Sequence, residues 1–305
     1  MTRRGWCALL PGALLAQETV IRVEVRLVRI LATVKNTAGE PVGTLEKGDF
    51  EVFDNGVRQE LAVFERYTEQ PLSVAVLIDT SASTGIQLHY EVASVERFLK
   101  ALVDEGNPRD AAALYSFNYQ VSLEEGFTRR LERLARALKG LKNQGGTSLY
   151  DAIFLAARNV EGREGRHVMV VVTDGGDTTS VKNFHQALEA AQMADVVLYP
   201  ILVMPITNEP GRNIGGENAL SGLAAGTGGR VFFPSAGPGL DAAFAEILRE
   251  LRTQYLLAYY PKDLPPTKER FHHLEVRVRR PDLRVLARSG YYEESEAGRG
   301  WSRVR

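Results

Sequence analysis

The sequence lacks three features that large classes of proteins need, since it has few cysteines, almost no net charge and no long apolar runs. It contains one cysteine in 305 residues, Cys7, so a disulfide framework and thiol chemistry have no basis. Its 37 Lys and Arg nearly balance 38 Asp and Glu, and a formal net charge of −1 provides no field that attracts nucleic acid or anionic lipid. The longest apolar runs, such as residues 167–173, are far shorter than the roughly 20 residues that cross a bilayer. We therefore expect no nucleic-acid partner and no transmembrane segment.

The first residues follow the order of a secretory signal. Arg3 and Arg4 precede a short apolar stretch, and the small Ala16 stands before polar residues. We predict that residues 1–16 are a signal peptide and that the protein is secreted or periplasmic; the alternative is a start with no targeting role. Cys7 would be removed with this segment and no lipobox surrounds it, so we expect no lipid anchor.

Both ends of the remaining chain have the pattern of β-strands. Residues 20–31 alternate between polar and apolar side chains, and a turn at Asp54-Asn55-Gly56 separates two short strand patterns. The predicted strands cover residues 20–31, 49–53, 58–64, 255–260, 274–279 and 284–287. Neither end alone has enough strands for a stable pair of sheets. We therefore predict that the two ends together form one small β-sandwich.

The middle of the chain predicts a doubly wound, mostly parallel α/β domain inserted in that sandwich. Unbroken apolar runs, typical of strands covered on both faces, alternate with amphipathic segments. The runs are residues 72–79, 111–117, 167–173, 196–203 and 230–233, and the predicted helices are 86–103, 129–141, 148–160, 183–194, 217–226 and 240–252. A short link between residues 111–117 and 120–123 indicates a hairpin with one antiparallel edge strand. The predicted boundaries are 17–68 and 254–293 for the two halves of the sandwich, 69–253 for the α/β domain and 294–305 for a flexible tail.

Small side chains that carry oxygen gather at three places in the α/β domain. Asp79-Thr80-Ser81-Ala82-Ser83 follows the first apolar run, Gly145-Gly146-Thr147-Ser148 precedes a helix, and Thr173-Asp174-Gly175 follows the third run. In an open α/β sheet, loops at the carboxyl ends of the strands converge on one crevice. We therefore expect these three loops to meet.

Together these side chains suit a hard divalent cation. Asp79, Ser81, Ser83, Thr147 and Asp174 bring two carboxylates and three hydroxyls. Ligands without nitrogen or sulfur favour Mg²⁺ over zinc, with Mn²⁺ and Ca²⁺ as alternatives. Two carboxylates at most cancel the charge of the ion, so it stays electrophilic. We expect it to complete its coordination with a Glu or Asp carboxylate of a partner protein, inside a rim of loops around Gly145, Gly175 and residues 208–217.

Each cluster also has a structural explanation when it is taken alone. Residues 84–87 and 148–151 fit or approximate helix capping boxes, and Asp174-Gly175 is a turn sequence. Asp177 is a candidate either for orienting a metal ligand from behind or for capping a turn. The joint occurrence of three clusters, each at the end of the appropriate element, favours the metal site.

In this combination the residues resemble the von Willebrand factor A domains, whose metal-ion-dependent adhesion site has an Asp-x-Ser-x-Ser loop, a Thr in a second loop and an Asp in a third. The five candidate ligands match these positions one by one. The resemblance covers residues 72–252, and residues 48–56, 254–261 and 288–292 are similar to the flanks of bacterial secreted VWFA-related proteins. It implies a Rossmann-like fold and a magnesium site. Thr84 departs from the Met that many members have there.

We therefore predict a secreted, metal-dependent protein-binding module of the adhesion type. Two alternatives stay open: a structural scaffold whose metal site takes no ligand, and an intracellular assembly subunit of an ATPase complex. We expect no enzyme, because a haloacid-dehalogenase phosphatase needs a carboxylate where Ser81 stands, and the sequence lacks G-x-S-x-G and G-x-x-x-x-G-K-[ST] motifs. Adjacent His272 and His273 should point to opposite faces of a strand, in structural or surface roles.

Overall fold

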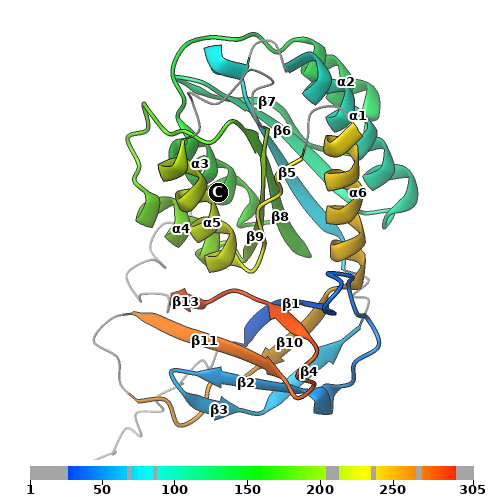
Figure 1. Ribbon diagram of the computed structural model, residues 1–305, viewed down its shortest axis with the longest axis vertical. Helices are drawn as coiled ribbons and strands as arrows, with labels where there is room; N and C mark the ends of the chain where they lie inside the picture. The colour runs from blue at the N-terminus through cyan, green and yellow to red at the C-terminus, as the bar shows by residue number, and fades with distance from the viewer. Residues whose placement is uncertain are drawn as a thin grey trace, which may run out of the picture.

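A computed structural model of the chain describes residues 27–66, 70–84, 88–203, 213–234, 238–265 and 270–292. These residues form an α/β domain and, below it in Figure 1, two small antiparallel sheets. The predicted signal peptide, residues 20–26 of the first predicted strand and the predicted tail lie outside the described residues. The fold class predicted from the sequence is confirmed, since a mostly parallel sheet between helices is joined to antiparallel sheets built from both ends of the chain.

The central sheet of the α/β domain has five strands in the order β7-β6-β5-β8-β9. They are β5 (Leu72–Asp79), β6 (Ala111–Phe117), β7 (Val121–Thr128), β8 (Arg166–Thr173) and β9 (Val196–Leu202). Strands β5, β6, β8 and β9 are parallel and every residue in them is buried, as their continuous apolar runs predict. The antiparallel β7 completes the predicted hairpin at the edge of the sheet, where its side chains are half-buried or exposed.

Three helices cover each face of this sheet (Figure 1). One face carries α1 (Leu88–Glu105), α2 (Leu131–Lys139) and α6 (Pro238–Thr253), and the other carries α3 (Leu149–Val160), α4 (Phe184–Met193) and α5 (Ile214–Thr227). The side chains of successive β5 residues point to opposite faces of the sheet. Val76 packs in the core beneath α1, α2 and α6, and Leu77 packs in the core beneath α3, α4 and α5. None of the described helices is long and apolar enough to cross a membrane.

The two ends of the chain share both sheets of the sandwich. One sheet has the order β12 (Arg284–Leu286), β1 (Val28–Lys35), β10 (Tyr255–Tyr259), β4 (Leu61–Glu65); the other has β13 (Gly290–Tyr292), β11 (Phe271–Val278), β2 (Phe50–Asp54), β3 (Val57–Gln59). Side chains of both ends, such as Val52 and Leu257, fill the core between them. The predicted sandwich is therefore confirmed, and β10 is hydrogen-bonded on both sides to N-terminal strands.

Two strand predictions are wrong in detail. Residues 58–64 do not form one strand, because β3 pairs with β2 in one sheet and β4 pairs with β10 in the other, so the chain changes sheets at Glu60. Residues 230–233 contribute a single bridge, from Phe232 to Ile201, rather than a sixth strand. The segment lies between Gly229 and Pro234, and proline has no N–H to continue a ladder.

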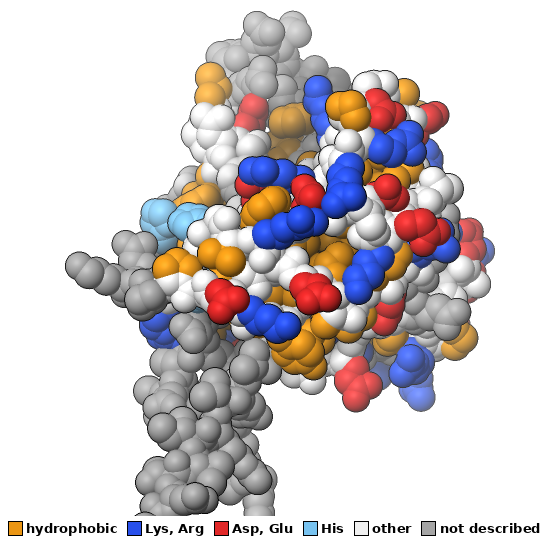
Figure 2. All heavy atoms as spheres, turned by 90° about the horizontal axis from the view of Figure 1, so that it is seen from below, with side chains coloured by type: hydrophobic (Ala, Val, Ile, Leu, Met, Phe, Trp, Pro, Cys, Tyr) orange, Lys and Arg blue, Asp and Glu red, His pale blue; other side chains and the backbone are white. Residues whose placement is uncertain are grey.

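The sandwich contacts the α/β domain at the amino-terminal ends of the parallel strands. Arg288, in the C-terminal half of the sandwich, pairs with Asp195 just before β9, and Lys35 of β1 pairs with Glu250 of α6 at 2.6 Å. The carboxyl ends of the strands therefore lie at the opposite edge, away from the sandwich. Figure 2 views the sandwich end, where acidic and basic side chains are interspersed, as in the pairing of Glu51 with Arg58.

Candidate metal centre

The first loop of the candidate centre is ordered around Asp79, the last residue of β5. This carboxylate is fully buried; its Oδ1 accepts a hydrogen bond from the backbone N–H of Ser81 at 2.8 Å and its Oδ2 accepts one from the Thr173 hydroxyl at 2.6 Å. Thr84, where many von Willebrand factor A domains have Met, is also buried, and its hydroxyl donates to the carbonyls of Asp79 and Ser81. The side chain of Ser83 lies outside the described residues. The first loop is thus fastened to the end of β8 through Thr173.

The second loop, which carries Thr147, is tied to the other two by its backbone. Thr147 donates its N–H to the Thr178 hydroxyl at 2.9 Å, and its carbonyl accepts from the N–H of Thr178 at 2.8 Å. Asn118, at the end of β6, connects the first and second loops: its side chain donates to Thr80 at 3.1 Å, and its carbonyl accepts from the N–H of Ser148. The structure therefore brings the second loop against the first, as the sequence predicted.

The third loop begins at Asp174, directly after β8. Gly175 has φ +104° and packs so tightly that a Cβ atom there would lie 2.6 Å from Leu202, which explains the need for glycine. At Gly216, in the first turn of α5, a Cβ atom would overlap the carbonyl of Gly175. The start of α5 therefore rests directly on the third loop, a contact between segments about 40 residues apart that the sequence pattern did not predict.

Asp177 and the start of α3 have a structural arrangement of their own. The Asp177 carboxylate accepts from the N–H of Tyr150 at 3.3 Å and from the Ser180 hydroxyl, which holds the third loop against the first turn of α3. The capping box considered for residues 148–151 is wrong, since Ser148 makes no side-chain cap and Asp151 accepts from the N–H groups of Val181 and Lys182. The role of Asp177 in orienting a metal ligand stays a prediction.

The two aspartates at this edge of the sheet have no basic partner among the residues that the structure describes: no Lys, Arg or His there forms an ion pair with Asp79 or Asp174. Burial raises the pKa of Asp79 to about 6 despite the hydrogen bonds from Thr173 and Ser81, and the charge of Asp174 adds to the increase. These loops hold two carboxylates near each other. A bound cation would stabilise this arrangement, because it would offset their negative charges.

A third buried carboxylate belongs to the same surroundings, and the sequence analysis missed it. Glu91 in the first turn of α1 is 1% exposed, and the charges of Asp79 and Asp174 contribute, after burial, to raising its pKa to about 8. The signal was available in the sequence: Glu91 stands four residues before Val95 and seven before Phe98, on the apolar face of the helix. An acidic residue on that face is unusual enough to mark a site.

The donor set fits a hard cation that relies on hydroxyls as well as carboxylates. Over the described part of the chain, no three His, Cys, Asp or Glu side chains come close enough to hold a metal ion between them. Zinc and other metals that need several such ligands are therefore a poor fit, whereas two aspartates with serine and threonine hydroxyls suit Mg²⁺. The buried oxygens of Glu91, which have no hydrogen-bond partner among the described residues, are consistent with a missing positive charge nearby.

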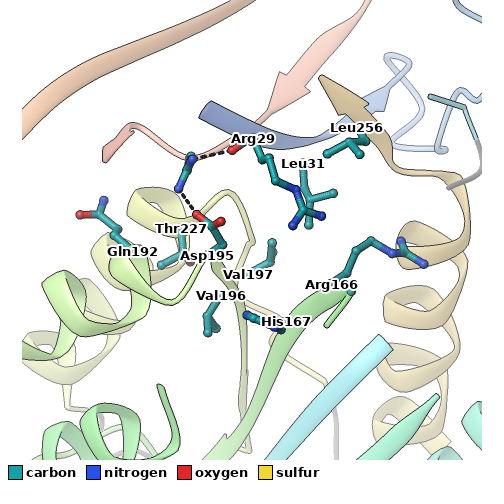
Figure 3. Close-up of a pocket in the computed structure, with 12 residues that line it drawn as sticks. Arg29, Leu31, Arg166, His167, Gln192, Asp195, Val196, Val197, Thr227 and Leu256 are labelled. Atoms are coloured by element: carbon teal, nitrogen blue, oxygen red, sulfur yellow. Dashed lines mark hydrogen bonds and ion pairs between the residues drawn. The ribbon is translucent and has the colours of Figure 1, made fainter. Parts of the chain in front are cut away.

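A cavity elsewhere in the molecule is not part of this centre. It lies between the sandwich and the amino-terminal ends of β8 and β9, with Arg29, Arg166 and His167 in its lining (Figure 3). Its volume is about 40 Å³, room for only a few water molecules. Arg288 closes one side by pairing with Asp195 and donating to the carbonyl of Arg29. The cavity belongs to the interface between the two domains.

Comparison with known proteins identifies the α/β domain. Residues 74–176, which include β5 with Asp79, the Thr147 loop and Asp174, match the family model of the von Willebrand factor type A domain. The chain contains a von Willebrand factor A domain. Among curated proteins, none matches the sequence significantly.

Solved structures share the fold of this von Willebrand factor A domain. The corresponding domain of the type V pili tip protein Mfa5 from Porphyromonas gingivalis is 16% identical, with a TM-score of 0.50, over 58% of this chain and 94% of that one. BatB from Bacteroides thetaiotaomicron is 20% identical, with a TM-score of 0.45, over 60% of this chain and 100% of that one. An aerotolerance-related membrane protein from Bacteroides fragilis is 19% identical, with a TM-score of 0.46, over 59% and 98%. At 16% identity and a TM-score of 0.50, the likeness to the Mfa5 domain concerns the fold alone, and the two structures with scores below 0.5 carry no argument about this chain.

Proposed function

We propose that the von Willebrand factor A domain of this protein captures an acidic side chain of a partner protein through a divalent cation, Mg²⁺ in the first place. Domains of this family are protein-interaction modules in general. The observation that carries the finer proposal is the buried and uncompensated Asp79, which lies with Thr147 and Asp174 at an edge of the sheet that the sandwich leaves open.

The residues of this chain have separate tasks in the proposed centre. Asp79 and Asp174 would supply the charge, and the hydroxyls of Ser81, Ser83 and Thr147 would complete the protein ligands without adding charge. When bound, the cation supplies an electrophilic position that accepts a Glu or Asp oxygen from outside. The backbone bonds of Thr147 to Thr178 hold the second loop at a fixed place, so the site is organised before a partner arrives.

Exposed apolar side chains beside these loops would form the rim of the contact. Tyr119, 51% exposed, packs over Gly146, and Ile214, 64% exposed, follows Asn213, whose side chain approaches Gly176. Large apolar and aromatic residues around a central polar bond are typical of protein interfaces. Among residues 208–217 of the predicted rim, only 213–217 are described, and they include the start of α5.

We also propose that the protein works outside the cytoplasm and has no enzymatic activity. The basic and apolar order of the first 16 residues supports export. The fold match to the Mfa5 domain, from a pili tip protein, agrees with a place at the cell surface. The N-terminus of the protein recovered from its native cell tests this: a new start near residue 17 is expected, and an intact Met1 in the cytoplasm would favour an assembly subunit instead.

The central test compares metal binding and partner capture in three proteins. Wild type, Asp79→Ala and the exposed control Asp241→Ala are titrated with Mg²⁺ in a calorimeter and then used to retain proteins of the native extracellular fraction with Mg²⁺ or with chelator. We expect Mg²⁺ binding and chelator-sensitive capture by wild type and control, and loss of both in Asp79→Ala. Capture that survives both the chelator and Asp79→Ala would show that the site is not used for adhesion.

A further inference from the structure

Glu91 is a buried acidic group for which the described residues offer no partner that would explain its burial. Neither carboxylate oxygen has a hydrogen-bond partner among the described residues, and the side chain is 1% exposed. The charged groups that act on it are Asp79 and Asp174, and both repel it. Glu91 therefore lies close enough to the candidate metal centre to sense both of its aspartates.

Three other buried acids among the described residues have partners within the protein, although Oε2 of Glu250 accepts no hydrogen bond there. Glu250 pairs with Lys35 at 2.6 Å and with Arg230 at 2.8 Å, and Asp54 accepts hydrogen bonds from two tyrosine hydroxyls. Asp110 accepts from two backbone N–H groups at 2.7 and 2.8 Å. The contrast indicates that the compensation for Glu91 comes from outside the described residues, and a bound cation is one source of it.

The position of Glu91 in a helix does not account for its burial. An acid in the first turn of a helix interacts favourably with the helix dipole, but an exposed side chain obtains that benefit without losing its hydration. The same helix keeps Glu96 in solvent. Glu91 is also not a direct ligand together with the two aspartates, because no three acidic or other ligating side chains among the described residues meet at one point. Glu91 is therefore not one of a cluster of three acidic ligands.

We propose that Glu91 is a positioning residue of the metal centre, whose buried carboxylate compensates the charge of the cation from behind the ligands Asp79 and Asp174. This inference rests on the proposed cation site and extends it, because it gives the centre a third negative charge that the family motif does not contain. Groups one layer behind metal ligands commonly change metal affinity 10- to 100-fold when they are replaced. Without the cation, the same carboxylate destabilises the fold.

The test uses Glu91→Gln, which keeps the shape and removes the charge, in the full chain. Mg²⁺ affinity is measured by calorimetry, and thermal midpoints are recorded with Mg²⁺ and with chelator. We expect Glu91→Gln to weaken Mg²⁺ binding by about tenfold or more and to raise the midpoint in chelator, a pair of opposite changes that a purely structural Glu91 would not produce. Glu96→Gln, on the exposed face of α1, is the matched control and should change neither.

A second variant separates charge from shape. Glu91→Asp keeps the charge with a shorter side chain, so its Mg²⁺ affinity should stay within a few-fold of wild type. If wild type binds Mg²⁺ and Glu91→Gln binds it equally well, or if Asp and Gln weaken binding alike, the inference is wrong while the cation site stands. If wild type itself binds no Mg²⁺ and matches Asp79→Ala, the proposed function fails first.

Discussion

The sandwich and the α/β domain both contain buried carboxylates, but the two regions differ in which groups pair with or hydrogen-bond to them. In the sandwich, Asp54 accepts from Tyr259 at 2.7 Å and Tyr291 at 2.8 Å and pairs with His272 at 3.0 Å. At the carboxyl edge of the α/β sheet, Asp79 accepts only neutral donors, and Glu91 has no partner among the residues described. A carboxylate that the protein satisfies serves the fold, whereas one left uncompensated points to a ligand.

The largest expected effect comes from removing the N-terminal half of the sandwich. A chain that begins at residue 70 lacks β1 and β4, the two neighbours of β10, and β2, the neighbour of β11. The apolar face of Leu274, Val276 and Val278 would then be open, so we expect aggregation on size-exclusion chromatography. A chain that begins at residue 27 is the control. A truncated protein as soluble and heat-stable as this control would contradict the shared sandwich.

Asp54→Ala should be the most damaging single substitution of those compared here. It removes a buried carboxylate that accepts from the hydroxyls of Tyr259 and Tyr291 and contacts the ring of His272, which costs about 3 to 5 kcal/mol. Urea unfolding followed by circular dichroism measures the loss. Asp282→Ala, at an exposed carboxylate of the same sandwich, should change stability by less than about 0.5 kcal/mol. Equal losses in both variants would remove the distinction between buried and exposed acids.

The buried acids Asp79 and Glu91 at the candidate metal centre should make the metal-free protein less stable as the pH rises. The pKa of Glu91 is raised from 4.5 to about 8 and that of Asp79 from 3.8 to about 6, so between these limits the folded state binds more protons than the unfolded state. At about 1.4 kcal/mol for each unit of pKa shift, the unfolding free energy should fall by several kcal/mol from about pH 4 to pH 8 and level off above that.

Urea titrations in chelator at several pH values measure how the free energy of unfolding changes with pH. Glu91→Gln should remove most of this slope. Excess Mg²⁺ should also flatten the slope, because the cation favours the ionised carboxylates. A metal-free stability that stays constant or rises between pH 5 and pH 8 would mean that these acids are compensated after all.

The smallest effect is expected for Asp79→Asn in chelator. The amide removes the unfavourable buried charge but loses the hydrogen bond from Ser81 or Thr173, so the two terms nearly cancel and stability should change by no more than about 1 kcal/mol. The same substitution should abolish stabilisation by Mg²⁺. If Asp79→Asn lowered the free energy of unfolding as much as Asp54→Ala, Asp79 would be a structural acid. The difference inferred between the two regions would then be wrong.

Much of this arrangement could be read from local patterns. Continuous apolar runs identified β5, β6, β8 and β9, and the Asn55-Gly56 pair identified the turn between β2 and β3, where both residues have positive φ. Because the carboxyl ends of parallel strands share an edge, the same patterns brought Asp79, Thr147 and Asp174 into one neighbourhood. For Ser83, whose side chain lies outside the described residues, the role as a ligand stays a prediction.

The errors arose where a pattern is compatible with more than one partner. The alternation of residues 58–64 does not tell whether successive residues pair with the same sheet, and the chain in fact changes sheets at Glu60. At residues 230–233 the apolar run was real, but Phe232 is buried by a single bridge to Ile201 rather than by a full strand. Burial alone does not require a ladder of hydrogen bonds.

The sequence by itself determined which elements form and which oxygen-bearing side chains stand at their ends, because periodicity and turn chemistry are local properties of the chain. Only the tertiary structure decided that Glu91 is buried where the charges of Asp79 and Asp174 act on it, and that Gly216 lets α5 rest on the third loop. Those features depend on how α1 and α5 pack against a sheet whose strands come from distant segments. The charge balance of the candidate centre is therefore a property of the assembled fold, since electrostatic energy depends on distance and burial rather than on order along the chain.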